Sequence, residues 1–140
     1  SWARAKPERR AEMKPLHGKT VDLPYDKVLA KTEQILANEG FGVLCRIDVK
    51  EKLKERIGVE MDLYMILGAC LPPMAHKAIT AEPEIGIMLP CNVVVRQVEG
   101  GTRVEVVNTD AMVQMFPGSD TLKGVADEVG QKLEKALQAI

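Results

Sequence analysis

The sequence contains no uninterrupted apolar stretch long enough to cross a bilayer, which would need roughly 20 residues. It also lacks an excess of positive charge, because 19 Lys and Arg residues are balanced by 20 Asp and Glu residues and the formal net charge is -1. The first absence excludes an integral membrane protein. The second removes the simplest case for a nucleic-acid binder, which needs many surplus cations. We therefore expect a soluble protein with neither a membrane span nor a nucleic-acid partner.

The motifs of several enzyme classes are absent as well. The only serines are Ser1 and Ser119, and neither lies in the G-x-S-x-G pattern of a serine hydrolase. Gly100-Gly101 is not followed by the Lys-Ser/Thr pair of a phosphate-binding loop. The cysteines show no paired C-x-x-C spacing of the kind that binds zinc. The sequence therefore leaves the catalytic residues unknown and predicts no metal and no cofactor.

The composition that remains is that of an ordinary globular domain. Hydrophobic residues make up 46% and charged residues 28% of a chain of 140 residues, which is long enough to bury one core. Residues 1–14 are polar and basic, and we interpret them as a flexible arm or a non-native remnant. Residues 15–140 are predicted to form a single domain.

Hydrophobic periodicity predicts alternating strands and helices. Apolar residues at a period of 3.6 indicate helices, and β-rich runs bounded by turn signals indicate strands. Residues 110–116 are ambiguous between a loop and one helical turn. The predicted strands are 17–23, 41–47, 64–70, 85–89, 91–98 and 102–108, and the predicted helices are 24–38, 49–57, 72–80 and 119–140.

The predicted order is therefore β-α-β-α-β-α-β-β-β-α, with the first and last helices the longest. A terminal hairpin that turns at Glu99-Gly100-Gly101 and is followed by a long helix favours an α+β fold. We expect a mostly antiparallel sheet with helices packed on one face.

The three cysteines, Cys45, Cys70 and Cys91, all lie in apolar stretches. This pattern predicts small buried side chains in a reducing, cytoplasmic compartment. The chain begins with Ser rather than Met, so the alternative is an exported protein from which an N-terminal signal has been removed.

Several distinct motifs occur in order between residues 40 and 95: GFGVL followed by IDV, LKExxGV, Y-x-ILGAC-x-PP-x-A and E-x-G-x-x-LPCNVVV. On these motifs the chain resembles the family known as domain of unknown function 302, over about residues 18–140. The resemblance implies a TATA-box-binding-protein-like fold and a homodimer, and it implies no established reaction. Members usually read GACNPP, whereas this chain has Leu71 in place of the asparagine, so a polar role of that side chain is absent.

Two of these motifs interrupt apolar strands with small residues, thiols and prolines. Small residues let a ligand approach the backbone, and a helix that starts after Cys70 offers free N–H groups at its N-terminus. If the two segments lie side by side, they would form a small-ligand site that His76 could also line. The predicted ligand-binding residues are Gly68, Cys70, Pro72, Pro73, Cys91 and Asn92.

Three functions are compatible with these residues. The leading hypothesis is a homodimer that binds a small ligand without reacting with it. One alternative is a thiol-dependent redox or metal-binding protein that uses Cys70 or Cys91, although both thiols could simply be packing residues. The other alternative is a structural or regulatory interaction module.

Overall fold

The structure, a computed structural model, describes residues 14–140 and contains one five-stranded sheet. The strand order is β1-β5-β4-β3-β2, and every neighbouring pair is antiparallel. The arm predicted at residues 1–14 falls, except for Lys14, outside the described residues. The strands are β1 (Leu16–Val21), β2 (Gly42–Asp48), β3 (Tyr64–Cys70), β4 (Cys91–Val98) and β5 (Gly101–Val107).

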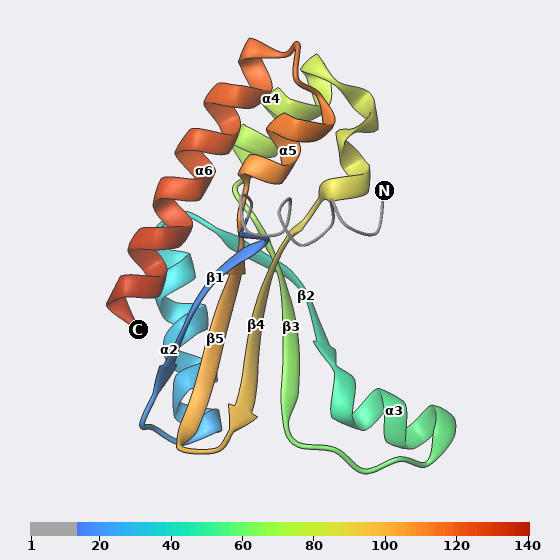
Figure 1. Cartoon of the computed structure of the whole chain (residues 1–140), viewed down its shortest axis with the longest axis vertical. Coiled ribbons are helices and arrows are strands. Elements are labelled where there is room, and N and C mark those ends of the chain that lie inside the picture. Colours follow the sequence, from blue (N-terminus) through green and yellow to red (C-terminus); the bar gives the residue numbers. More distant parts are fainter. Residues whose placement is uncertain (1–13) are drawn as a thin grey trace, which may run out of the picture.

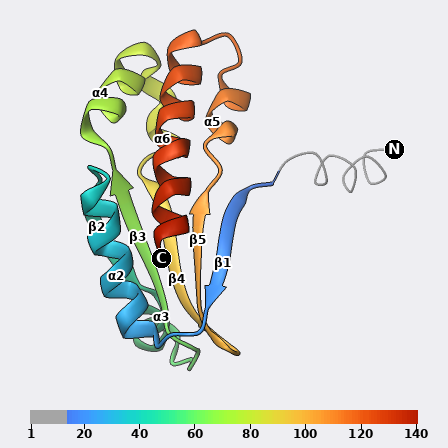
Figure 2. The ribbon, with the colours of Figure 1, turned by 90° about the vertical axis from the view of Figure 1, so that its left-hand side faces the viewer.

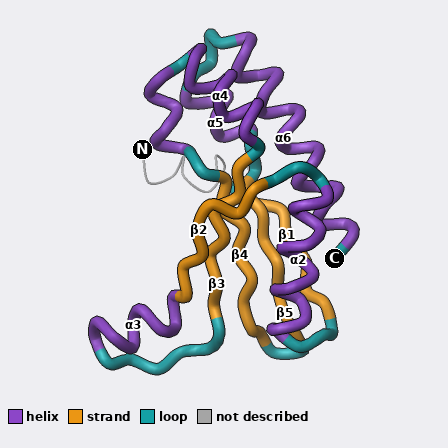
Figure 3. Tube along the Cα trace, turned by 180° about the vertical axis from the view of Figure 1, so that it is seen from behind, coloured by secondary structure: helices purple, strands orange, loops and turns teal. Residues whose placement is uncertain are grey.

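The helices take three different positions around the sheet (Figures 1 and 2). The two longest, α2 (Tyr25–Asn38) and α6 (Asp120–Ala139), pack on one face, as predicted. Beyond one end of the sheet lie α4 (Pro72–Ala81), the 3-10 helix η1 (Pro83–Met88) and α5 (Asp110–Met115). Helix α3 (Val49–Ile57) projects from the opposite side of the molecule, as Figure 3 also shows.

The long helices form because their sequences carry both a start signal and an apolar stripe. The Ser119 side chain accepts a hydrogen bond of 3.2 Å from the backbone N–H of Leu122 and so caps α6. The apolar stripe of α6 is buried almost completely, and Ile140, just after the helix, is half-buried. Its buried residues are Leu122, Val125, Ala126, Val129, Leu133, Ala136 and Leu137.

The core lies between these helices and alternate residues of the central strands. Val93 and Val95 of β4 face Leu67 on β3 and Val104 on β5, and all four side chains are 0% exposed. A strand alternates its side chains between two faces, so the residues between them point to the other side of the sheet. One face of the sheet is therefore the core, and the α+β class predicted from the sequence is confirmed.

Helix α3 has the predicted bounds. The Asp48 side chain accepts a 3.0 Å hydrogen bond from the backbone N–H of Glu51 and so caps the helix. The helix ends at Gly58, whose φ of 70° is a left-handed conformation that glycine adopts without strain. None of its residues is buried, so it contributes nothing to the core.

The strand predicted at 85–89 was wrong, because Ile85–Met88 lie in η1 and Leu89 is its C-cap. Pro83 begins a tight helical turn, and the backbone N–H of Leu89 bonds to the carbonyl of Gly86 at 3.1 Å. Ile85 is fully buried but Ile87 is 78% exposed, so the apolar run has only one buried side. A short apolar run does not by itself distinguish a strand from a helical turn. The ambiguous stretch near residue 110 became the six-residue helix α5.

Candidate functional site

A cavity of about 250 Å³ lies where the ends of β3 and β4 meet the helices beyond the sheet. Among residues 14–140 no charged side chain lines it, and the polar side-chain groups on its wall are two thiols. It is lined by Leu44, Ala69, Cys70, Leu71, Met74, Ala75, Ala78, Ile79, Leu89, Pro90, Cys91, Met112, Val125 and Val129.

The strand register brings the two predicted segments together. Ala69 of β3 pairs with Cys91 of β4, so Cys70 and Cys91 are close neighbours on adjacent strands. The chain enters α4 directly after Cys70, and α6 adds Val125 and Val129, one turn apart, to the wall. Both cysteines therefore border one hollow, as the sequence predicted for a ligand site.

The two thiols differ in their surroundings. Cys91 is 6% exposed, and burial, with a smaller contribution from neighbouring Cys70, raises the pKa of its thiol to about 11. At neutral pH this thiol is protonated, and a protonated thiol is a poor nucleophile. Cys70 is only half-buried, so any thiol chemistry in this cavity would start at Cys70.

Gly68 lies beside the cavity rather than in its wall. It pairs with Asn92 across the strands, and a Cβ placed on it would lie 2.5 Å from Cys45 Sγ and 2.9 Å from Pro90 Cγ. The missing side chain therefore makes room for Cys45 and for the proline that borders the cavity. Gly68 thus allows close packing of the chain's own side chains against the backbone, rather than the approach of a ligand.

The other predicted residues take separate positions. Pro72 and Pro73 are exposed at the start of α4, and Pro73 borders a shallow surface hollow together with exposed His76. Asn92 is exposed and lines a neighbouring depression that shares Pro90 and Cys91 with the cavity. The structure thus gathers Cys70 and Cys91, brings Asn92 next to them, and leaves the two prolines and His76 outside.

The prediction of free N–H groups at the start of α4 was wrong. Pro72 and Pro73 have no N–H, and the N–H groups of Met74 and Ala75 each bond to the carbonyl of Leu71 at 3.0 Å. The first turn of α4 therefore presents no free donor from these residues to an anion. Leu71 itself packs against the core and lines the cavity.

The prediction that all three cysteines are buried was wrong for Cys45, which is exposed. Cys45 lies on the edge strand β2, where a register shift between Val43 and Cys45 marks a bulge. Leu44, within the bulge, is 66% exposed and also borders the cavity. An apolar sequence context does not reveal that a strand lies at the edge of its sheet.

Most of the cavity wall was missed at the level of the sequence. Val125 and Val129 belong to the apolar stripe of one helix, while Met74 and Met112 come from two others. A helical period marks Val125 and Val129 as inward-facing, but it does not say that a space is left beside them. Only the packing of α4 and α5 against α6 decides that.

The structure shows neither a metal cluster nor a transmembrane helix in the part that it describes. Within residues 14–140, no group of three or more His, Cys, Asp or Glu side chains is arranged to hold a metal ion. No helix in the same range is both long and apolar enough to cross a membrane.

Comparison with known proteins identifies the family. The model of the family described as "Domain of unknown function DUF302" matches residues 17–140. The chain belongs to the DUF302 family. Its fold is similar to the crystal structure of an uncharacterized conserved DUF302 protein from Bacillus stearothermophilus, with 28% identity and a TM-score of 0.83. That match covers 91% of this chain and 98% of the other. No curated protein matches this DUF302 chain.

Proposed function

We propose that this DUF302 protein is a homodimer that binds a small, uncharged, mostly apolar molecule in the cavity beside Cys70 and Cys91, without reacting with it. Gly68 supports the wall from behind, and Asn92 lies at the adjoining depression, where it can donate to a polar group of the ligand. Pro72 and Pro73 start the helix that carries Met74 and Ala75 into the wall, so they position the site without lining it.

The observation that supports this proposal is the chemistry of the wall. All of its side chains are aliphatic, thioether or thiol groups, and none could neutralise a charge on a ligand. An ion placed there would lose its hydration without a partner, which costs several kcal/mol. Apolar cavities of comparable size stay dry and take up small apolar molecules such as benzene.

Thermal unfolding with matched probes tests the proposal. Benzene, indole and 1-hexanol should raise the Tm, by roughly 3–6 °C at about ten times the dissociation constant. Benzoate and indole-3-acetate, which have similar shapes but carry a charge, should leave it unchanged.

Two alanine variants on the same helix provide the control. Ala75→Leu places a larger side chain in the cavity and should abolish the probe-dependent rise in Tm. Ala81→Leu makes the same change at an exposed position of α4 and should preserve it. If the neutral probes do not shift the Tm of the unaltered protein, or if Ala75→Leu responds as Ala81→Leu does, the proposal is wrong.

A second candidate function is thiol chemistry at Cys70, which the position of this half-buried thiol on the cavity wall favours. Such a role predicts that Cys70 reacts with iodoacetamide faster than a free cysteine does, while Cys91 stays protected by its raised pKa. Rates would be measured by mass spectrometry at neutral pH. A Cys70 rate equal to or below that of free cysteine would argue against this function.

In this proposal, the free cysteines indicate the cellular compartment of the protein. All three cysteines are free, which suits a reducing compartment such as the cytoplasm. Isolation of the native protein with a Cys70–Cys91 disulfide would instead favour export.

A further inference from the structure

The sheet face opposite α2 and α6, here called the open face, is only partly screened from solvent. Its side chains alternate along the strands with those of the core, and none of them is buried. On β2 and the neighbouring strands it is apolar, with Ile47, Ile66 and Val94 paired in a row and Ile47 44% exposed. This row has the composition of an interface core.

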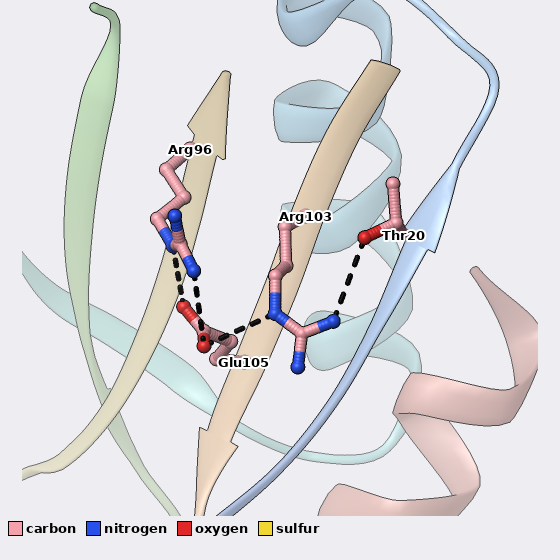
Figure 4. Close-up of polar contacts among 4 residues, drawn as sticks. All are labelled: Thr20, Arg96, Arg103 and Glu105. Atoms are coloured by element: carbon pink, nitrogen blue, oxygen red, sulfur yellow. Dashed lines mark hydrogen bonds and ion pairs between the residues drawn. The ribbon is translucent and has the colours of Figure 1, made fainter. Parts of the chain in front are cut away.

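The charges of the open face are already paired within the chain (Figure 4). Arg96 donates to Glu105 at 2.7 and 3.5 Å, and Arg103 donates to the same carboxylate at 3.2 Å and to the Thr20 hydroxyl at 3.5 Å. Paired and hydrogen-bonded charges lose much less on burial than isolated ones. Two arginines and one glutamate leave one surplus positive charge on this part of the face.

Helix α3 has an apolar side that stays partly exposed. Leu53 is 36% and Ile57 67% exposed, and Val59 just after the helix is 41% exposed. A nine-residue helix is marginal in water without packing. The exposed ion pairs Lys52–Glu55 and Lys54–Glu60 offset little of that cost. Figures 1 and 3 show α3 projecting from the edge of the sheet, away from α6.

The segment that follows α3 is acidic. It carries Glu60, paired with Lys54 at 2.9 Å, and Asp62, which is exposed and has no ion pair among residues 14–140. This negative charge complements the surplus positive charge of Arg96 and Arg103. Each chain carries both the negative charge and the positive charge. In a dimer with a two-fold axis, the negative charge of each copy can therefore meet the positive charge of the other, which gives two equivalent contacts.

We infer that a second copy of this chain docks on the surface formed by the open face and α3. In this dimer, α3 of each copy lies against the open face of the other. This inference rests on the proposed homodimer and adds which surface forms it. The apolar side of α3 then packs on Ile47, Ile66 and Val94, and Asp62 approaches the arginines.

The size of the surface suits a stable dimer. Five strands about 4.8 Å apart and roughly 20 Å long present about 500 Å² in projection, to which α3 adds on the order of 100 Å². Side chains make the accessible area larger than its projection, so the total approaches the roughly 800 Å² per partner of a standard interface.

Substitutions at exposed positions test the surface without disturbing the core. Ile57→Glu and Ile47→Glu should each weaken the dimer by about 100-fold or more in sedimentation-velocity measurements, because they place a charge in its apolar centre. Ile87→Glu alters a still more exposed isoleucine on η1 and should leave the dissociation constant unchanged. Circular dichroism of the dilute proteins should show all three folded.

Charge variants test the predicted orientation. Asp62→Lys should weaken the dimer by about 5–10-fold, and more at low salt, whereas Asp127→Lys on the exposed side of α6 should have no effect. A protein that is monomeric at high concentration would overturn both the homodimer and this inference. A dimer that survives Ile57→Glu and Ile47→Glu, or that is lost when only residues 1–13 are removed, would overturn the inference alone.

Discussion

The two faces of the sheet are built from the same strands but have different compositions. On β4, Val93 and Val95 face the helices and are 0% exposed, while Val94 and Arg96 point the other way and stay half-exposed. On the covered face the central strands β3, β4 and β5 present mainly buried apolar side chains. On the other face an ionic network lies beside an apolar row. The comparison teaches that one face stabilises the monomer, whereas the other is free to serve association.

The largest expected effect contrasts neighbouring residues on the two faces. Leu67→Ala removes a fully buried side chain from the covered face and should lower the free energy of unfolding by about 3–4 kcal/mol. Ile66→Ala, its half-exposed neighbour, should cost about 1 kcal/mol in dilute protein. Urea denaturation measures both, and equal losses would mean that the open face is as tightly packed as the core.

The next effect concerns the thiol at the end of the covered face. The pKa of Cys91 is raised by burial in the folded state, so its contribution to stability is complete below the unfolded pKa, near 9, and is lost as pH rises toward about 11. Unfolding free energy should fall by about 2–3 kcal/mol more in the unaltered protein than in Cys91→Ala over that range. If the free energy of unfolding of the two proteins changed with pH in the same way, the pKa of Cys91 would not be raised.

A smaller effect is expected where the open face meets the cavity wall. Gly68→Ala would bring a methyl group within 2.5 Å of Cys45 Sγ, and we expect a loss of about 2 kcal/mol. Adding Cys45→Ala should restore part of this stability, although Pro90 remains close. Gly86→Ala, which meets open space, is the control. If chemical denaturation shows that Cys45→Ala restores no stability to Gly68→Ala, the strain does not come from the contact with Cys45.

The smallest effect is expected at the ionic network. Hydrogen bonds from Arg96, then from Arg103, hold the pKa of Glu105 below its ordinary value. Its contribution is therefore present above the unfolded pKa, near 4.3, and is lost as pH falls through the folded pKa. Glu105→Gln should lower stability at pH 7 by about 1 kcal/mol and flatten the acid side of the profile. Urea denaturation between pH 3 and 7 measures this. If the free energy of unfolding of the variant fell with decreasing pH as steeply as that of the unaltered protein, the prediction would be contradicted.

Local signals made much of the fold predictable. The cap at Asp48, the glycine at position 58 and the apolar stripes of α2 and α6 act within a few residues, and all were recovered with bounds close to those observed. Ile85–Leu89 failed because an apolar run of that length packs equally well as a strand or as a helical turn. Cys45 failed because edge position and bulging depend on the neighbouring strand.

The candidate site, like the fold, was predictable from the sequence only in part. That Cys70 ends one strand and Cys91 opens another was predictable, but that they border a common space depended on the pairing of these two strands, which only the structure shows. That Pro72, Pro73 and His76 lie outside that space was not predictable either, since it depends on how α4 tilts over the sheet. The cavity itself is a property of packing between distant segments, and no residue pattern encodes a void.

The sequence by itself determined the α+β class and most element boundaries, because hydrophobic period, capping and turn residues act over short stretches of chain, and its motifs carried the resemblance to the family. Only the tertiary structure decided which thiol is buried, that none of residues 14–140 brings a charged side chain to the cavity wall, and that the open face and α3 stay partly exposed in this part of the chain. These depend on contacts between segments far apart in the chain, where the packing of one side chain is set by all of its neighbours at once.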